Sequence, residues 1–307
     1  MNKIVKISAI VLLGIILFTA CDDDIPVGQL KEKYQKQNSA FIDIDGVPVH
    51  YIIEGNAADT MPIVLIHGTS ASLHTWDTLS SLLKNTKKII RFDLPAFGLT
   101  GPSRLNQYTF NYYNNFIDSL LYKLNFTKCI IAGNSLGGSI AWNYALASPN
   151  KVDKLILLDA SGYPKKDEKG SLGFKLAAIP VLNQVLKHVS PKSLVRKSLE
   201  DAFYNKTLVN EAMVEQYHNM LLRKGNRGAI LELFQHPMKP DATRIKNITQ
   251  PTLIIWGKED QLISYQNASL FKQDILNSCM LVLDKVGHIP MEEAPVEVAD
   301  AILKFIK

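Results

Sequence analysis

The stretch IIAGNSLGGS, residues 130–139, sets one serine among three glycines at the end of an apolar run. Residues 129–132 are apolar and partly β-branched, which predicts a buried strand, and residues 139–147 predict a helix ended near Pro149. Glycine adds no packing and costs backbone entropy, so these glycines indicate a backbone too crowded for side chains. We expect a strand-to-helix turn that presents the hydroxyl of Ser135, as in a nucleophile elbow.

This pattern also has a plain structural interpretation, a glycine-rich turn that only lets a helix pack on its strand. G-x-S-x-G is short enough to arise by chance, so the catalytic interpretation depends on finding partners for the serine elsewhere in the chain.

The composition is that of a globular protein. The 307 residues are 47% hydrophobic and 21% charged, with a net charge of +5, which allows one large α/β domain with an insertion. No dense Lys/Arg block interleaves with aromatic residues, so we expect no nucleic-acid partner. No group of residues has metal-ligand spacing, and no cofactor is expected.

The N-terminus is typical of a signal peptide over residues 1–20. Lys3 and Lys6 precede an apolar run at 7–20 that is too short to span a bilayer comfortably, although a short signal-anchor is the alternative. The following LFTAC resembles the lipobox of bacterial lipoproteins, with Phe18 where that motif usually has Leu. The resemblance implies that Cys21 is lipidated and anchors the protein in the bacterial cell envelope, to a membrane facing the periplasm or the cell surface.

Residues 21–39 are mostly polar and predict a tether between the anchor and the domain. Cys129 and Cys279 each open an apolar run, and we expect both to be buried as small hydrophobic side chains.

Strand candidates recur along the rest of the chain. FIDIDGVPVHYIIEG, residues 41–55, alternates on both sides of Asp45-Gly46 and predicts a hairpin. Further apolar candidates lie at 63–66, 88–92, 129–132, 155–158, 253–256 and 280–283. Helix-like segments between most of them predict an α/β fold, with a mostly parallel sheet of about eight strands covered by helices on both faces.

The interval 163–249 breaks this alternation and predicts an inserted helical cap, which leaves 40–162 and 250–307 as the core. Its helical spacing is carried by Leu182, Val185, Leu186 and Val189, and by Met213, Tyr217, Met220 and Leu221. Residues 164–250 hold 15 Lys/Arg against 8 Asp/Glu. We favour a solvated helical surface over a face for anionic lipid or substrate.

A serine nucleophile needs a histidine that takes its proton and a carboxylate that orients the histidine. His288 follows a predicted strand and a glycine, and Asp260 lies just past another strand end. Asp159 is the rival acid, because it ends the preceding strand. The order Ser135, Asp260, His288 is the serine, acid, histidine order of α/β-hydrolases.

An oxyanion hole needs two backbone N–H groups. Leu136, directly after the serine, would supply one, and the loop HGTSAS would supply the other through Thr69, with Ser70 as the alternative. His67 and Asp93 also end strands, and we expect them to shape their loops.

Five motifs together resemble those of capped α/β-hydrolases and span nearly the whole chain after the signal: VLIHGTSAS, FDLPAFGLTGP, AGNSLGGS, WGKEDQLIS and VGHIPMEEAP. The resemblance implies Ser135 as nucleophile, Asp260 as acid, His288 as base, and Thr69 and Leu136 as oxyanion donors. Glu293 resembles a structural glutamate of that family, and Ala96 stands where relatives usually carry glycine.

Among functions of that family, we expect hydrolysis of a small-molecule carboxylic ester. A serine at 135 argues against relatives that attack through aspartate. Carbon–carbon bond hydrolases share a GNS elbow but tend to carry an aromatic residue after the histidine, where this chain has Ile289. A non-catalytic, ligand-binding lipoprotein of the same fold is the other alternative.

Overall fold

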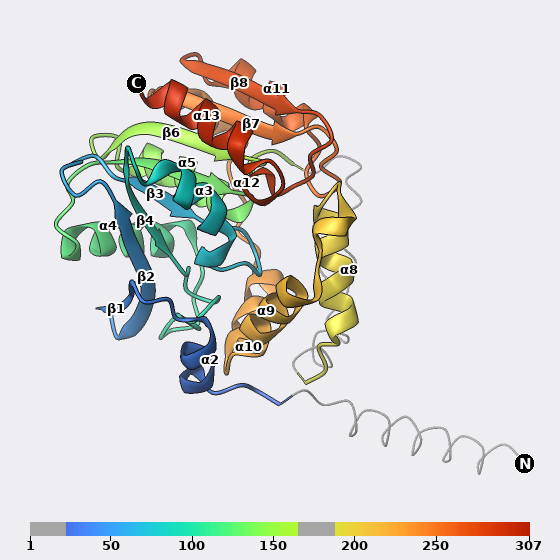
Figure 1. The fold of residues 1–307 in the computed structure, drawn as a ribbon. Helices are drawn as coiled ribbons and strands as arrows, with labels where there is room; N and C mark the ends of the chain where they lie inside the picture. Colours follow the sequence, from blue (N-terminus) through green and yellow to red (C-terminus); the bar gives the residue numbers. More distant parts are fainter. Residues whose placement is uncertain (1–22, 165–187) are drawn as a thin grey trace, which may run out of the picture.

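The computed structural model describes residues 23–164 and 188–307, which fold around one eight-stranded sheet (Figure 1). Its order is β1-β2-β4-β3-β5-β6-β7-β8. The strands are β1 Ser39–Ile44, β2 Val47–Gly55, β3 Ile63–Ile66, β4 Lys88–Phe92, β5 Cys129–Asn134, β6 Val152–Leu158, β7 Thr252–Gly257 and β8 Ser278–Leu283. Only β1–β2 and β2–β4 pair antiparallel, so the predicted mostly parallel α/β sheet is confirmed.

The predicted hairpin is the β1–β2 pair. Its two-residue turn holds Asp45 at φ 53° and Gly46 at φ 80°, and a turn with two positive φ values suits the right-handed twist of the flanking strands.

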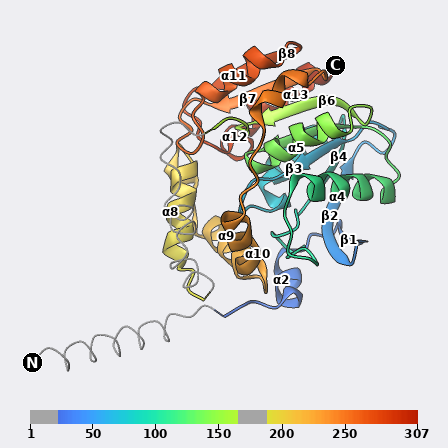
Figure 2. The same ribbon diagram turned by 180° about the vertical axis from the view of Figure 1, so that it is seen from behind.

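Helices cover both faces of the sheet, because its central strands are apolar on both sides. On β3, Val64 and Ile66 pack in the core beneath the helices that span residues 110–123 and 136–147, whereas Ile63 and Leu65 pack in the core beneath those that span 77–83 and 295–306. The view from behind shows α4, α5 and α11 against their face (Figure 2). These covering helices are α3 Asp77–Leu83, α4 Phe110–Lys123, α5 Leu136–Ala147, α11 Gln266–Asp274, α12 Pro290–Glu293 and α13 Pro295–Ile306.

In the part of the β6–β7 interval that the structure describes, three α-helices follow one another within the interval predicted as a cap. They are α8 Lys192–Ala202, α9 Glu211–Leu222 and α10 Asn226–Gln235, and they lie on one side of the sheet, where strands β5 and β6 end (Figure 1). The helical spacing predicted at Met213, Tyr217, Met220 and Leu221 falls in α9, while that at Leu182, Val185 and Leu186 lies outside the described residues. Val189, the last residue of that predicted set, is described and lies in a non-helical segment before α8.

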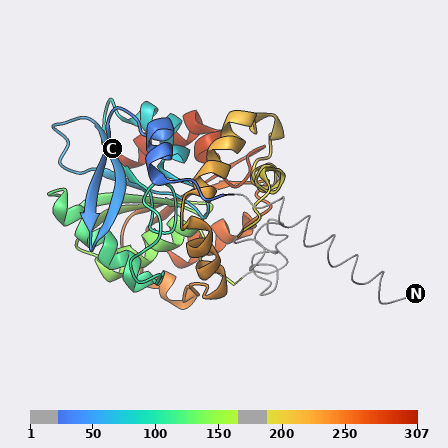
Figure 3. The ribbon, with the colours of Figure 1, turned by 90° about the horizontal axis from the view of Figure 1, so that it is seen from below.

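The predicted tether contains a helix, α2 Val27–Tyr34, that packs on the rest of the protein (Figure 3). Leu30 is buried against Leu99 and Met220. The backbone of Ile25 bonds to the end of α9 on both sides: its N–H donates to the carbonyl of Leu222 (2.8 Å), and its carbonyl accepts from the N–H of Lys224 (3.0 Å). Residues 23–34 therefore form part of the folded body. The lipidation site Cys21 and the predicted signal peptide lie outside the described residues.

The expectation for cysteine burial holds at one position and is wrong at the other. Cys129 is buried in the central strand β5, whereas Cys279 is exposed. The reason is its place on β8, an edge strand whose side chains are half-buried or exposed. Among the described residues, none of the helices is both long enough and apolar enough to span a bilayer.

Candidate active site

Ser135 lies between the end of β5 and the first residue of α5, in a strained backbone conformation. Its φ of 54° and ψ of −116° fall in a region that residues with a side chain seldom occupy. Three hydrogen bonds hold this conformation: the Ser135 N–H donates to the carbonyl of Leu158, and its carbonyl accepts from the N–H groups of Ser139 and Ser161, each at 3.1 Å. The strand-to-helix turn expected from the sequence is therefore present, and it carries the serine into a pocket.

The glycines around Ser135 serve close approach, since the positive φ is taken by the serine itself. A Cβ on Gly133 would lie 2.2 Å from the carbonyl oxygen of Gly137, and a Cβ on Gly137 would lie 2.2 Å from that of Ile66. Helix α5 can thus start directly against β5 and β3 only if both positions lack a side chain.

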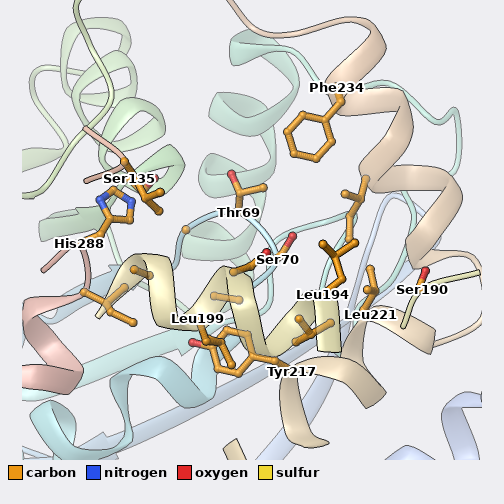
Figure 4. Close-up of a pocket in the computed structure, with 18 of the residues that line it drawn as sticks. Thr69, Ser70, Ser135, Ser190, Leu194, Leu199, Tyr217, Leu221, Phe234 and His288 are labelled. Atoms are coloured by element: carbon orange, nitrogen blue, oxygen red, sulfur yellow. The ribbon is translucent and has the colours of Figure 1, made fainter. Parts of the chain in front are cut away.

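His288 and Asp260 meet beside the serine. Nδ1 of His288 lies 2.7 Å from Oδ2 of Asp260, and both side chains are almost fully buried. The imidazole ring lies next to the side chain of Ser135, and both residues line the same pocket (Figure 4). An acid that accepts from Nδ1–H leaves Nε2 of the ring as the proton acceptor, which is the arrangement a serine nucleophile requires.

The side chain of Asp260 is fixed by the backbone of the residues that follow it. Its Oδ1 accepts from the N–H groups of Leu262 (2.8 Å) and Ile263 (3.0 Å), so its second oxygen is left to His288. The rival acid, Asp159, is fully buried nearby, and its Oδ1 accepts from the N–H of Gly257 (2.9 Å). Burial raises the pKa of Asp159 well above its usual range, and the charge of Asp260 raises it further.

Among the described residues, Asp159, Asp260 and His288 are the one group of metal-ligating types whose ligand atoms all lie within 4.8 Å of one another. Both oxygens of Asp260 are already engaged, by two N–H groups and by the ring of His288. The chemistry of this group is therefore that of hydrogen-bonded acids and a base.

The loop that carries His288 is fastened to the end of α8. The His288 N–H donates to the carbonyl of Ala202 (2.7 Å), and a Cβ on Gly287 would lie 2.2 Å from that same oxygen. Glu293 ties the two segments together by accepting from the N–H groups of Gly287 (2.7 Å) and Asn205 (2.5 Å). Glu293 thus has the structural contacts that its resemblance implied.

The structure brings both alternatives for the second oxyanion donor, Thr69 and Ser70, into the pocket with Ser135 (Figure 4). Their loop lies close to the elbow, since a Cβ on Gly68 would lie 3.2 Å from that of Ser135. Leu136 is the first residue of α5, so its N–H belongs to those that a helix leaves without an internal partner.

His67 and Asp93 shape loops, as predicted. Nδ1 of His67 donates to the carbonyl of Gly68 (2.8 Å) and Nε2 accepts from the N–H of Leu94 (3.0 Å), while burial lowers the pKa of its ring. Asp93 accepts from the N–H groups of Leu73 and Leu99, both at 2.7 Å.

Asn134 has a role that the sequence analysis missed. Its Nδ2 donates to the carbonyls of Leu158 (3.2 Å) and His288 (3.0 Å), so it links the elbow to the histidine loop. Its place directly before the serine in the elbow motif was the available signal.

The pocket has a volume of about 170 Å³ and is lined by mostly apolar side chains. Its floor is formed by Ser135, His288 and the loop of Thr69, and α8, α9 and α10 supply the opposite wall (Figure 4). Tyr217 and Arg227 are polar members of that wall; the sequence analysis names Tyr217 only for its helical spacing and does not name Arg227. The guanidinium of Arg227 forms an ion pair with Asp24 at 2.7 Å.

Comparisons with known proteins agree with this architecture. Residues 61–295 match the alpha/beta hydrolase fold family. The uncharacterized hydrolase YugF of Bacillus subtilis is 29% identical over 267 residues, which cover 86% of this chain and 96% of that protein. Lipase 1 of Psychrobacter immobilis is 27% identical over 259 residues, covering 83% of this chain and 79% of the lipase.

A solved structure of a meta-cleavage product hydrolase from Pseudomonas fluorescens IP01 superposes with a TM-score of 0.75 at 23% identity. The match covers 87% of this chain and 96% of that one. The chain belongs to the alpha/beta hydrolase fold family, and the protein is a hydrolase.

Proposed function

We propose that the protein hydrolyses carboxylic esters through an acyl-enzyme. The observation that carries this proposal is that Ser135 and His288 line the floor of one apolar pocket while Asp260 holds the ring of His288 from behind through its Nδ1. The hydroxyl of Ser135 attacks the ester carbonyl carbon while Nε2 of His288 takes its proton. The same nitrogen then returns the proton to the departing alcohol, and water releases the acid.

The negative charge that develops on the carbonyl oxygen needs two donors. We assign these to the backbone N–H groups of Leu136 and Thr69, because one begins a helix beside the serine and the other lies in the loop packed against the elbow. Each such donor contributes about 2.7 to 4 kcal/mol to catalysis.

The pocket favours a short acyl or aryl group. Its volume of about 170 Å³ is close to that of an engineered apolar cavity of about 150 Å³ that binds benzene. We therefore expect p-nitrophenyl butyrate and hexanoate to be cleaved with a higher kcat/KM than the palmitate ester.

Carbon–carbon bond hydrolysis is the alternative, because a meta-cleavage product hydrolase shares the fold. The side chain after His288 is Ile289, which is buried and lines the pocket. It offers no aromatic ring to a conjugated dienoate, so we favour the ester. The name of the lipase relative supports the same choice.

Fluorophosphonate labelling of the purified protein tests the nucleophile. We expect labelling of the wild type and none of Ser135→Ala, with Ser139→Ala, a buried serine one helical turn further on, as the matched control that still reacts. Rates on p-nitrophenyl esters and on a dienolic diketone then separate the two reactions. Faster cleavage of the diketone would replace the ester proposal.

For the N-terminus we propose a lipoprotein of the bacterial cell envelope, anchored through Cys21. The support is the LFTAC motif after a short apolar run. Cells fed an alkyne fatty acid should label the wild type and the Cys279→Ser variant, whose altered thiol is exposed, but not Cys21→Ser. Labelling of Cys21→Ser would refute the anchor.

A further inference from the structure

Asp159 is a second carboxyl group within the proposed catalytic centre, and the mechanism above gives it no task. It follows β6 in a left-handed conformation with φ 45° and is fully buried. Oδ1 accepts from the N–H of Gly257, whereas Oδ2 is buried and no N–H or O–H donor of the described residues reaches it. A ligand atom of Asp159 lies within 4.8 Å of those of Asp260 and His288.

Two buried carboxyl groups this close do not both ionise, because like charges in a low dielectric repel strongly. Asp260 has the surroundings of the ionised member, since it accepts from two backbone N–H groups and from His288. Asp159 has one such N–H and faces the negative charges of Asp260 and Glu293. Burial and these negative charges all raise the pKa of Asp159. Asp159 is therefore the carboxyl group of the pair that keeps its proton.

We propose that Asp159 is a neutral carboxylic acid whose Oδ2–H donates a hydrogen bond to the carboxylate of Asp260, and that it thereby positions Asp260 for His288. The proton stays covalently bound to Asp159 throughout the reaction, and no bond is made or broken there. Asp159 is thus a positioning residue of the proposed hydrolytic site, and the inference rests on that site.

Substitutions at 159 separate this role from that of an ionised acid. Asp159→Ala removes the donor and should lower kcat by roughly 10- to 100-fold. Asp159→Asn supplies an N–H donor in place of the O–H and should recover most of that loss. Asp260→Asn, in contrast, should lose about 10⁴-fold, as expected when the group that orients the histidine is neutralised. Asp153→Ala, at an exposed position of the same strand, is the matched control.

The pH profile adds a readout that a purely structural role would not move. Without the donor, more negative charge faces His288, so the acidic limb of kcat/KM should move to higher pH in Asp159→Ala and return in Asp159→Asn. An Asp159→Asn variant as inactive as Asp260→Asn would overturn the proposal, because it would make Asp159 the ionised acid.

Infrared spectroscopy tests the proton in the wild-type protein itself and needs no activity. With ¹³C-labelled aspartate, a carbonyl band of a protonated carboxyl should be present at pH 7 and absent from Asp159→Asn. Its absence from the wild type would refute the inference. Failure of fluorophosphonate to label Ser135 would instead refute the proposed function, so the two failures are distinguishable.

Discussion

Glu292→Gln should remove a pH dependence from the stability of the protein. Glu292 is partly buried beside the pocket wall, where Thr75 and Tyr217 both donate hydrogen bonds to its Oε1. Burial raises the pKa of Glu292 from 4.5 to about 7; the bonds from Thr75 and Tyr217 lower it, and the charge of Asp77 raises it. The folded protein therefore holds this proton more tightly than the unfolded chain does.

The magnitude follows from the difference between the two pKa values. The stability that Glu292 contributes is fully present below pH 4.5 and is lost as the pH rises through about 7. At about 1.4 kcal/mol for each pH unit, the loss is about 3 kcal/mol, which solvent screening of a partly exposed group reduces to about 2 kcal/mol. A glutamine side chain does not titrate, so Glu292→Gln should show no pH-dependent loss of stability from this position.

Urea unfolding at pH 5 and pH 8 measures this difference, with the wild type and Glu292→Gln compared at each pH. All other titratable groups are the same in the two proteins, so their contribution cancels in the comparison. Glu297→Gln, at an exposed position of α13, is the matched control and should follow the wild type. Equal pH dependence in the wild type and Glu292→Gln would refute the reasoning.

Three further predictions follow from buried positions. Although burial alone would raise the pKa of Asp93, the adjacent His50 ring and the Leu73 N–H lower it to about 2, so the stability it provides is present above pH 4 and lost as the pH falls toward 2. Asp93→Asn should remove about 2 kcal/mol at pH 7 and much less at pH 2.5, measured by urea unfolding; an equal loss at both pH values would contradict this. Ala96 adopts φ 90°, so Ala96→Gly should change Tm little, whereas Ala141→Gly, inside α5, should lower stability by about 1 kcal/mol or more; equal losses would show that Ala96 is unstrained. Leu199→Ala enlarges the pocket from α8 and should shift the preferred p-nitrophenyl ester toward longer acyl chains at a cost of about 2–5 kcal/mol in stability; an unchanged preference would place the acyl group elsewhere.

The sequence predicts the fold well because the central strands are buried on both faces. Runs such as residues 63–66 and 253–256 are apolar throughout, and each was located within a residue or two of its observed bounds. The elbow was equally readable, since glycines at 133 and 137 reflect local contacts between neighbouring elements.

The environment of the acid was beyond sequence reasoning. Asp159 and Asp260 each follow a strand, and only the packing of β6 beside β7 shows which of them meets His288 and which is left with a raised pKa. The helix α2 was missed for a similar reason. Its sequence is polar apart from a few positions, and its contact with Met220 and Leu99 depends on segments far away in the chain.

Residues 24 and 25 are attached to helices α9 and α10 of the pocket wall, and this attachment bears on how the enzyme would be oriented at a membrane. Asp24 pairs with Arg227, a pocket residue, and three extended residues reach only about 10 Å. A lipid on Cys21 would therefore hold the pocket-wall helices α9 and α10 close to the bilayer. The short connection would not allow the protein to rotate that side away from the membrane. Molecules that partition into that leaflet would then be presented to the enzyme at a far higher local concentration than those in bulk water.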